Sequence, residues 1–162
     1  MSVRSIRNRA IFIVITLQVA SLLAFPSWVR SAPEVGRIVR VKVKTANVRK
    51  GPGTNHERIW RAPRNYPYKV IERSGKWLKV RDYEGYEEWI YGPLTDEQPA
   101  VVVRVKKANI RKGPGMKFPI LFRASKGAPF LVLEEEGKWL KVRHAGGNQG
   151  WIFGKLVWGK FP

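Results

Sequence analysis

The chain has 162 residues, enough for one ordinary domain or two small ones, and 12% of them are aromatic, including 7 Trp. Its 31 Lys and Arg against 12 Asp and Glu give a formal charge of +19, which favours polyanionic neighbours. It contains no Cys, which excludes disulfides, a thiolate nucleophile and a cysteine-based metal site.

Residues 1–32 have the layout of a secretory signal. Three Arg lie among the first nine residues, and an uncharged, mostly apolar run (AIFIVITLQVASLLA) follows from Ala10 to Ala24. This run is short for a membrane span. Neither Ala24 nor Ala32 makes a good A-x-A cleavage site, so two alternatives stay open: a cleaved signal, or an uncleaved anchor that holds the chain to the inner membrane through residues 10–29. Both predict export to the periplasm or cell envelope.

An internal repeat follows the signal segment, with a constant offset of 62 residues and no gap. KTANVRKGPG from Lys44 matches KKANIRKGPG from Lys106, and GKWLKVR begins at Gly75 and again at Gly137. Duplication of a whole folding unit explains such a match. The boundaries that it predicts are residues 36–94 for the first domain, 95–99 (TDEQP) for a short linker and 100–162 for the second domain.

Within each repeat the apolar residues recur with a period of two, which indicates strands with one solvent-exposed face. Val39, Val41 and Val43 alternate with cations, and Val101, Val103 and Val105 alternate in the same way with Val102, Arg104 and Lys106. Trp77 and Trp139 lie in similar alternating segments, and we expect them to be buried in the core. About five short strands in fewer than 60 residues, separated by Gly-rich turns, favour a small and partly open barrel.

These segments also resemble a known family. The run ANVRKGPG from Ala46, then GKWLKV from Gly75, then Trp89-Ile90, all repeated in order in the second unit, resembles the pattern of bacterial SH3-like (SH3b) domains. The resemblance covers nearly all of the chain beyond residue 36. It implies an all-β protein with two tandem small SH3-like β-barrels after an N-terminal hydrophobic signal helix. The first repeat departs from the pattern at Glu88, where the family usually has Gly, as Gly150 does in the second.

The resemblance further implies a peptide or glycan groove between the loops of each barrel. The aromatic and cationic residues that are candidates for the groove and its rim are Arg49, Lys50, Trp89, Tyr91, Arg111, Lys112, Trp151 and Phe153. Each has an alternative role: the Arg side chains either contact an anion or cover the barrel edge, and the Trp side chains belong either to the groove or to the core. Tyr66, Tyr68, Tyr83 and Tyr86 occur only in the first repeat, so a difference in ligand should lie there.

The sequence lacks the motifs of common enzymes, since it shows no Ser-His-Asp order, no phosphate-binding loop and no recurring pair of carboxylates. His56 and His144 have no neighbouring ligand set, so we expect neither a metal nor a cofactor. We predict a non-catalytic binding or adaptor protein of the bacterial cell envelope, which binds peptidoglycan, its peptides or a segment of a partner envelope protein. The alternative is charge-driven binding of an anionic polymer, lipid headgroups or nucleic acid, and export argues against nucleic acid.

Overall fold

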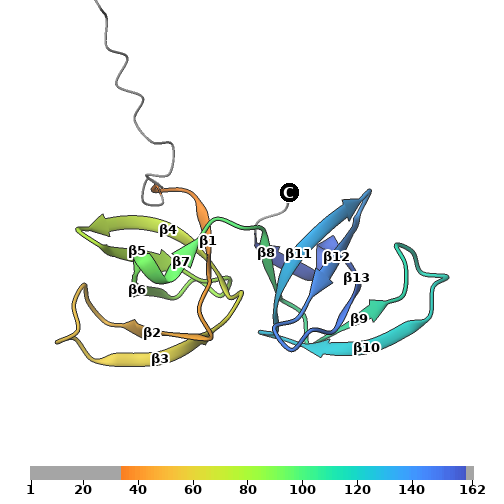
Figure 1. Cartoon of the computed structure of the whole chain (residues 1–162), viewed down its shortest axis with the longest axis horizontal. Coiled ribbons are helices and arrows are strands. Elements are labelled where there is room, and N and C mark those ends of the chain that lie inside the picture. Colours follow the sequence, from red (N-terminus) through yellow and green to blue (C-terminus); the bar gives the residue numbers. More distant parts are fainter. Residues whose placement is uncertain (1–33, 160–162) are drawn as a thin grey trace, which may run out of the picture. The chain divides into compact units, whose positions relative to one another are not determined.

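The computed structural model describes residues 34–159, and the predicted signal segment lies outside them. The described residues form two sheets of seven antiparallel strands each, and their helical content is two short 3-10 turns (Figure 1). The first sheet contains β1 (Ile38–Val41), β2 (Thr45–Arg49), β3 (Arg58–Pro63), β4 (Pro67–Ser74), β5 (Trp77–Arg81), β6 (Glu87–Tyr91) and β7 (Thr95–Asp96), with the 3-10 turn η1 (Gly92–Leu94) before β7. The second contains β8 (Ala100–Val103), β9 (Lys107–Arg111), β10 (Ile120–Ser125), β11 (Pro129–Glu136), β12 (Trp139–Arg143), β13 (Gln149–Phe153) and β14 (Val157–Gly159), with η2 (Gly154–Leu156) before β14.

The two sheets have the same strand order. The first runs β3-β2-β6-β5-β4-β1-β7 and the second runs β10-β9-β13-β12-β11-β8-β14. Both orders are open, as expected for a partly open barrel. The expectation of about five strands was too low, and one of the additional strands in each sheet is the short one that follows the 3-10 turn and pairs with the first strand. Two residues of the predicted linker 95–99 therefore form β7.

Each barrel has its own core, in which branched aliphatic side chains are buried together with an aromatic ring, Tyr68 in the first and Phe130 in the second. In the first barrel the core includes Val48, Val80 and Ile90, all fully buried, and in the second it includes Ile110, Val142 and Ile152. These residues are the inward-facing members of alternating strands, which is why the period of two was visible in the sequence.

The prediction that Trp77 and Trp139 belong to the core is wrong. Both are only partly buried, and neither is a member of the two core clusters. Leu78 and Val80 fill the inner face of β5, so the same alternation turns Trp77 to the outer face.

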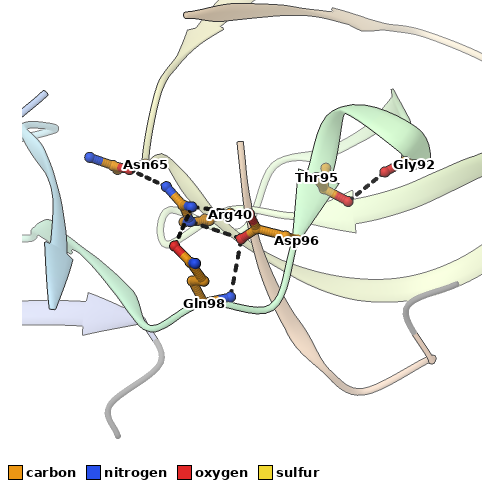
Figure 2. A network of polar contacts seen from close by, with 6 residues as sticks. All are labelled: Arg40, Asn65, Gly92, Thr95, Asp96 and Gln98. Atoms are coloured by element: carbon orange, nitrogen blue, oxygen red, sulfur yellow. Dashed lines mark hydrogen bonds and ion pairs between the residues drawn. The ribbon is translucent and has the colours of Figure 1, made fainter. Parts of the chain in front are cut away.

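A polar network fastens the start of the connection between the barrels to the first sheet (Figure 2). The Arg40 guanidinium donates to both carboxylate oxygens of Asp96, at 2.8 and 3.0 Å, and also to the Asn65 side-chain oxygen at 2.6 Å. Its third partner is the Gln98 side-chain oxygen. Because the Arg40 and Asp96 side chains are only 11% and 12% exposed, this pair is shielded from solvent far more than a surface salt bridge.

The corresponding strand pair of the second barrel is apolar and packs on the first barrel. Val102 and Trp158 face each other across β8 and β14, at the positions that Arg40 and Asp96 occupy in β1 and β7. Val102 is fully buried and belongs to the core cluster of the first barrel, against which Trp158 also packs. The expectation that Val102 lies on a solvent-exposed face is therefore wrong, since the first barrel covers that face.

A second contact between the barrels is electrostatic. The Lys126 ammonium donates to Glu84 at 2.6 Å and lies 5.9 Å from the centre of the Tyr83 ring. The hydrogen bond from Lys126 lowers the pKa of Glu84. Both charged side chains are substantially exposed, so this contact adds less to stability than the burial of Val102.

Candidate functional site

The outer face of each barrel carries an aromatic pair across its two central strands. Trp77 on β5 lies opposite Tyr91 on β6, with ring centres 5.5 Å apart and planes inclined by 57°. Trp139 and Phe153 repeat the arrangement at 5.4 Å and 52°. Tilted pairs at this separation are favourable beyond the area that they bury, so each pair forms a fixed aromatic platform.

In the first barrel this platform forms part of the wall of a groove of about 880 Å³. The volume lies in the range typical of ligand pockets, about 300 to 1,000 Å³. The groove combines aromatic rings, amide and hydroxyl groups and two guanidinium groups, and it is lined by Thr45, Asn47, Arg49, Gly53, Thr54, Asn55, Arg61, Trp77, Tyr91 and Leu94. The rings can pack on the apolar faces of a sugar or an aliphatic chain, while the guanidinium groups can pair with carboxylates.

One rim of the groove is the loop between β2 and β3, and Arg49 holds this loop in place. The Arg49 guanidinium donates to the backbone carbonyls of Thr54 and His56, at 3.0 and 2.6 Å. The first Gly of the Gly-Pro-Gly turn is required here, because a Cβ on Gly51 would lie 2.5 Å from the His56 ring. Arg49 therefore braces the loop and also lines the groove, while its role as an anion contact stays a prediction.

The second barrel repeats this brace with different side chains. Arg111 donates to the Phe118 carbonyl at 2.8 Å, and Phe118 packs against Gly113 as His56 packs against Gly51. At the positions equivalent to Thr45, Thr54 and Asn55 of the groove, the second repeat has Lys107, Met116 and Lys117. Its outer face is therefore more basic and more apolar than that of the first repeat.

The other predicted site residues do not line this groove. Trp89 shares the outer face of β6 with Tyr91 and is partly buried, but it pairs with Lys79 and Arg49 and does not line the groove. Trp151 is more buried, at 8% exposure, and the Lys141 ammonium lies 5.9 Å from its ring centre.

Lys50 and Lys112 are exposed residues of the loop that follows Arg49 or Arg111. Lys50 forms an ion pair with Glu57 at 2.6 Å. The residues that the prediction missed are Trp77, Asn47 and Arg61, although the alternation around Leu78 already placed Trp77 with the outward-facing cations.

The sequence matches a known domain family with the same duplicated organisation. The bacterial SH3 domain family matches twice, at residues 42–97 and 98–159. The chain belongs to the bacterial SH3 domain family. This match confirms the resemblance to bacterial SH3-like domains that the sequence indicated, with two tandem copies of the domain in the all-β fold described above.

Relatives that carry bacterial SH3 domains include proteins named as cell wall amidases. The chain is 34% identical over 62 residues to the probable cell wall amidase LytH of Staphylococcus epidermidis, which covers 38% of this chain and 21% of that protein. It is 28% identical over 67 residues to the putative N-acetylmuramoyl-L-alanine amidase YrvJ of Bacillus subtilis, which covers 41% of this chain and 13% of that protein. The chain therefore spans about a fifth or less of the length of these relatives.

Solved structures give a weaker likeness. An NlpC/P60 family protein from Bacillus cereus aligns with a TM-score of 0.36 and 15% identity, over 75% of this chain and 55% of that one. NlpC2 from Trichomonas vaginalis aligns with a TM-score of 0.35 and 16% identity, over 80% and 50%.

The two bacterial SH3 domains differ at the position before the Trp of β6 and β13. Gly150 has no room for a side chain, because a Cβ there would lie 2.5 Å from Ile110 Cγ2 and 2.8 Å from the Arg111 carbonyl oxygen. The equivalent Glu88 is 8% exposed and accepts a hydrogen bond from Trp60 Nε1 at 2.9 Å. Burial raises the pKa of Glu88.

Tyrosines unique to the first repeat surround this carboxylate. Tyr66 packs on Trp60 and Tyr68, with ring centres 5.0 Å apart in each case. Burial raises the pKa of Tyr68, and the negative charge of Glu88 raises it further. Of the four tyrosines that only the first repeat has, Tyr66 and Tyr68 are therefore buried near Glu88, whereas Tyr86 is 65% exposed.

The described residues contain neither a cluster of potential metal ligands nor a helix that could span a membrane. Within residues 34–159, no three His, Cys, Asp or Glu side chains are grouped so that they could hold a metal. None of the helical segments in that range is long and apolar enough to cross a membrane.

Proposed function

We propose that this protein is a non-catalytic adaptor of the bacterial cell envelope, whose first barrel binds peptidoglycan through its stem peptides. The observation that carries the proposal is the groove of about 880 Å³ that has the Trp77 and Tyr91 rings on one side and Arg49 in its wall. Stem peptides combine short aliphatic side chains with free carboxylates, which suit an aromatic platform beside guanidinium groups. The names of the amidase relatives, whose matched region is the SH3 domain, support a ligand in the cell wall.

The tandem arrangement supports binding by avidity. The second barrel carries the equivalent Trp139 and Phe153 pair, and Arg111 lies at the position of Arg49. Two weak sites joined by a short connection act at a high effective concentration of one another. Export to the periplasm or cell envelope, through a cleaved or retained N-terminal segment, is part of this proposal.

The test is co-sedimentation of residues 31–162, which form one compact unit, with purified peptidoglycan sacculi. Trp77→Ala should weaken retention by about tenfold, whereas Trp89→Ala, on the same outer face but outside the groove, should retain binding within about twofold. Retention should persist in about 0.5 M salt, because a groove is less sensitive to salt than phosphate neutralisation. Equal retention of the Trp77→Ala and unaltered proteins would reject the groove, and release of soluble cell-wall fragments by the unaltered protein would reject the non-catalytic role.

A further inference from the structure

The loop between β9 and β10 of the second barrel (Figure 1) is more apolar in sequence than the loop between β2 and β3 of the first. The first repeat reads TNHERI from Thr54 to Ile59, and the second reads MKFPIL from Met116 to Leu121. The second version exposes three large apolar side chains, with Met116 76%, Ile120 40% and Leu121 52% accessible to solvent. Of the equivalent positions in the first repeat, only Ile59 is a large apolar residue.

The same change also removes the acid of this loop. In the first repeat Lys50 forms an ion pair with Glu57, but the position equivalent to Glu57 in the second repeat is Pro119. Residues 98–133 contain eight Lys and Arg and no Asp or Glu. Over residues 98–162 the excess of cations is +10, against +5 over residues 33–97.

The exposed apolar side chains and the cations lie close together on a fixed loop. Ile120 pairs with Arg111 across the hairpin, and the Met116 sulfur lies 3.9 Å from an Arg111 guanidinium nitrogen. The register shifts between Ile120 and Phe122, so Leu121 is the extra residue of a bulge, a feature that redirects side chains at a strand end. The loop is braced by the hydrogen bond from Arg111 to the Phe118 carbonyl and by one from the Lys112 amide to the Pro119 carbonyl at 3.0 Å.

We propose that these residues form a membrane-contact tip, defined as Met116, Ile120 and Leu121 with Lys112 and Lys117, which docks on the surface of an anionic phospholipid bilayer. The ammonium groups would pair with headgroup phosphates, and the apolar side chains would enter the boundary between headgroups and acyl chains. Because the loop is already ordered, docking costs little conformational entropy.

The chemistry of the tip distinguishes a bilayer from other anionic partners. A water-soluble polyanion would pair with the cations but leave Met116 and Leu121 in water, so their apolar surface would contribute nothing to the binding free energy. A bilayer surface satisfies both features at once. The groove that carries the peptidoglycan proposal lies in the first barrel and the tip lies in the second, so vesicle binding and retention on sacculi are tested by separate variants.

The experiment measures binding of residues 31–162 to vesicles, so that the N-terminal hydrophobic segment does not contribute. Vesicles of phosphatidylglycerol mixed with phosphatidylcholine are compared with vesicles of phosphatidylcholine alone, by co-sedimentation. The double variant Met116→Thr with Leu121→Ser removes two exposed apolar side chains, and Ile59→Ser is the matched control in the first repeat. Heparin affinity serves as the readout for a soluble polyanion, and analytical ultracentrifugation reports self-association.

We expect the unaltered protein to bind the anionic vesicles and to bind pure phosphatidylcholine far more weakly. The double variant should bind anionic vesicles about tenfold or more weakly, while Ile59→Ser stays within about twofold, because only the double variant removes apolar area that docking on the bilayer would bury. Heparin affinity should be the same for all three proteins. The proposal is overturned if the double variant keeps its vesicle affinity, if phosphatidylcholine alone is bound equally well, or if the double variant only dissociates a dimer.

Discussion

Replacement of Val102 by Ala should destabilise the first barrel, although this residue belongs to the second repeat. Val102 is fully buried and is part of the core cluster of the first barrel, whereas its neighbours Val101 and Val103 point into the core of the second. Removal of two buried carbons costs about 0.8 kcal/mol each, and the cavity adds to this, so we expect a loss of about 2 kcal/mol in the unfolding free energy of the first barrel. The second barrel should lose less than about 0.5 kcal/mol, because β8 keeps its backbone pairing.

Hydrogen exchange, followed by mass spectrometry of peptides, resolves the two barrels. Peptides from β4 and β5 should exchange about 30-fold faster in Val102→Ala, since 1.4 kcal/mol corresponds to a factor of ten. Val101→Ala is the control, and it should accelerate exchange in β11 and β12 instead. Unchanged exchange in β4 and β5 of Val102→Ala would show that the contact between the barrels contributes nothing to the first core.

Three further changes test the interior and the connection. Gly150→Ala should lower the unfolding free energy by about 1 to 3 kcal/mol in urea denaturation, because the new methyl group would overlap the fully buried Ile110, and wild-type stability would contradict the close approach. Asp96→Ala should cost about 3 kcal/mol by leaving the shielded Arg40 with fewer partners, and a loss below about 0.5 kcal/mol would mean that the pair is worth no more than a surface salt bridge. Burial raises the pKa of Glu88, so the folded state holds this proton more tightly than the unfolded state, and stability should fall as pH rises from the ordinary carboxyl pKa through the raised one. Glu88→Gln should therefore show a shallower decline in urea midpoints as the pH rises above the ordinary carboxyl pKa, and an identical slope would refute the assignment to Glu88.

Much of the fold was predictable because duplication and a period of two are direct consequences of how strands pack. Inward-facing residues such as Val48 and Ile110 must be apolar in both copies, and the matching Gly-Pro-Gly turns require the same close approach of a ring. The prediction for Trp77 was wrong because it relied on the general preference of Trp for burial. Leu78 and Val80 alternate with Trp77 along the strand, and this alternation already indicated that Trp77 faces outward.

Other features depend on contacts that no local pattern contains. Val102 reads as an ordinary outward-facing residue, and only the placement of the first barrel against β8 explains why it is apolar. The groove likewise needs Arg49 and Arg61 from β2 and β3 beside Tyr91 from β6, and these strands are adjacent only in the folded sheet. Glu88 could be noticed as a departure from the family pattern, but its hydrogen bond with Trp60 joins residues 28 positions apart.

The two barrels share most of their inward-facing apolar residues, but they differ in the pair formed by the first and last strands of each sheet and in the loop after Arg49 or Arg111. The same strand pair carries Arg40 with Asp96 in the first barrel and Val102 with Trp158 in the second, and the backbone pairing is the same. The loop after Arg49 is polar with a paired Lys50, whereas the loop after Arg111 is apolar at its tip and lacks the acid. The two proposals together require the first barrel to hold a wall peptide while the second contacts a bilayer. The buried Val102 restricts the motion of one barrel relative to the other, which favours binding of both partners at once. Val102→Ala in a protein with both sites intact should then weaken simultaneous retention on sacculi and vesicles more than it weakens either alone.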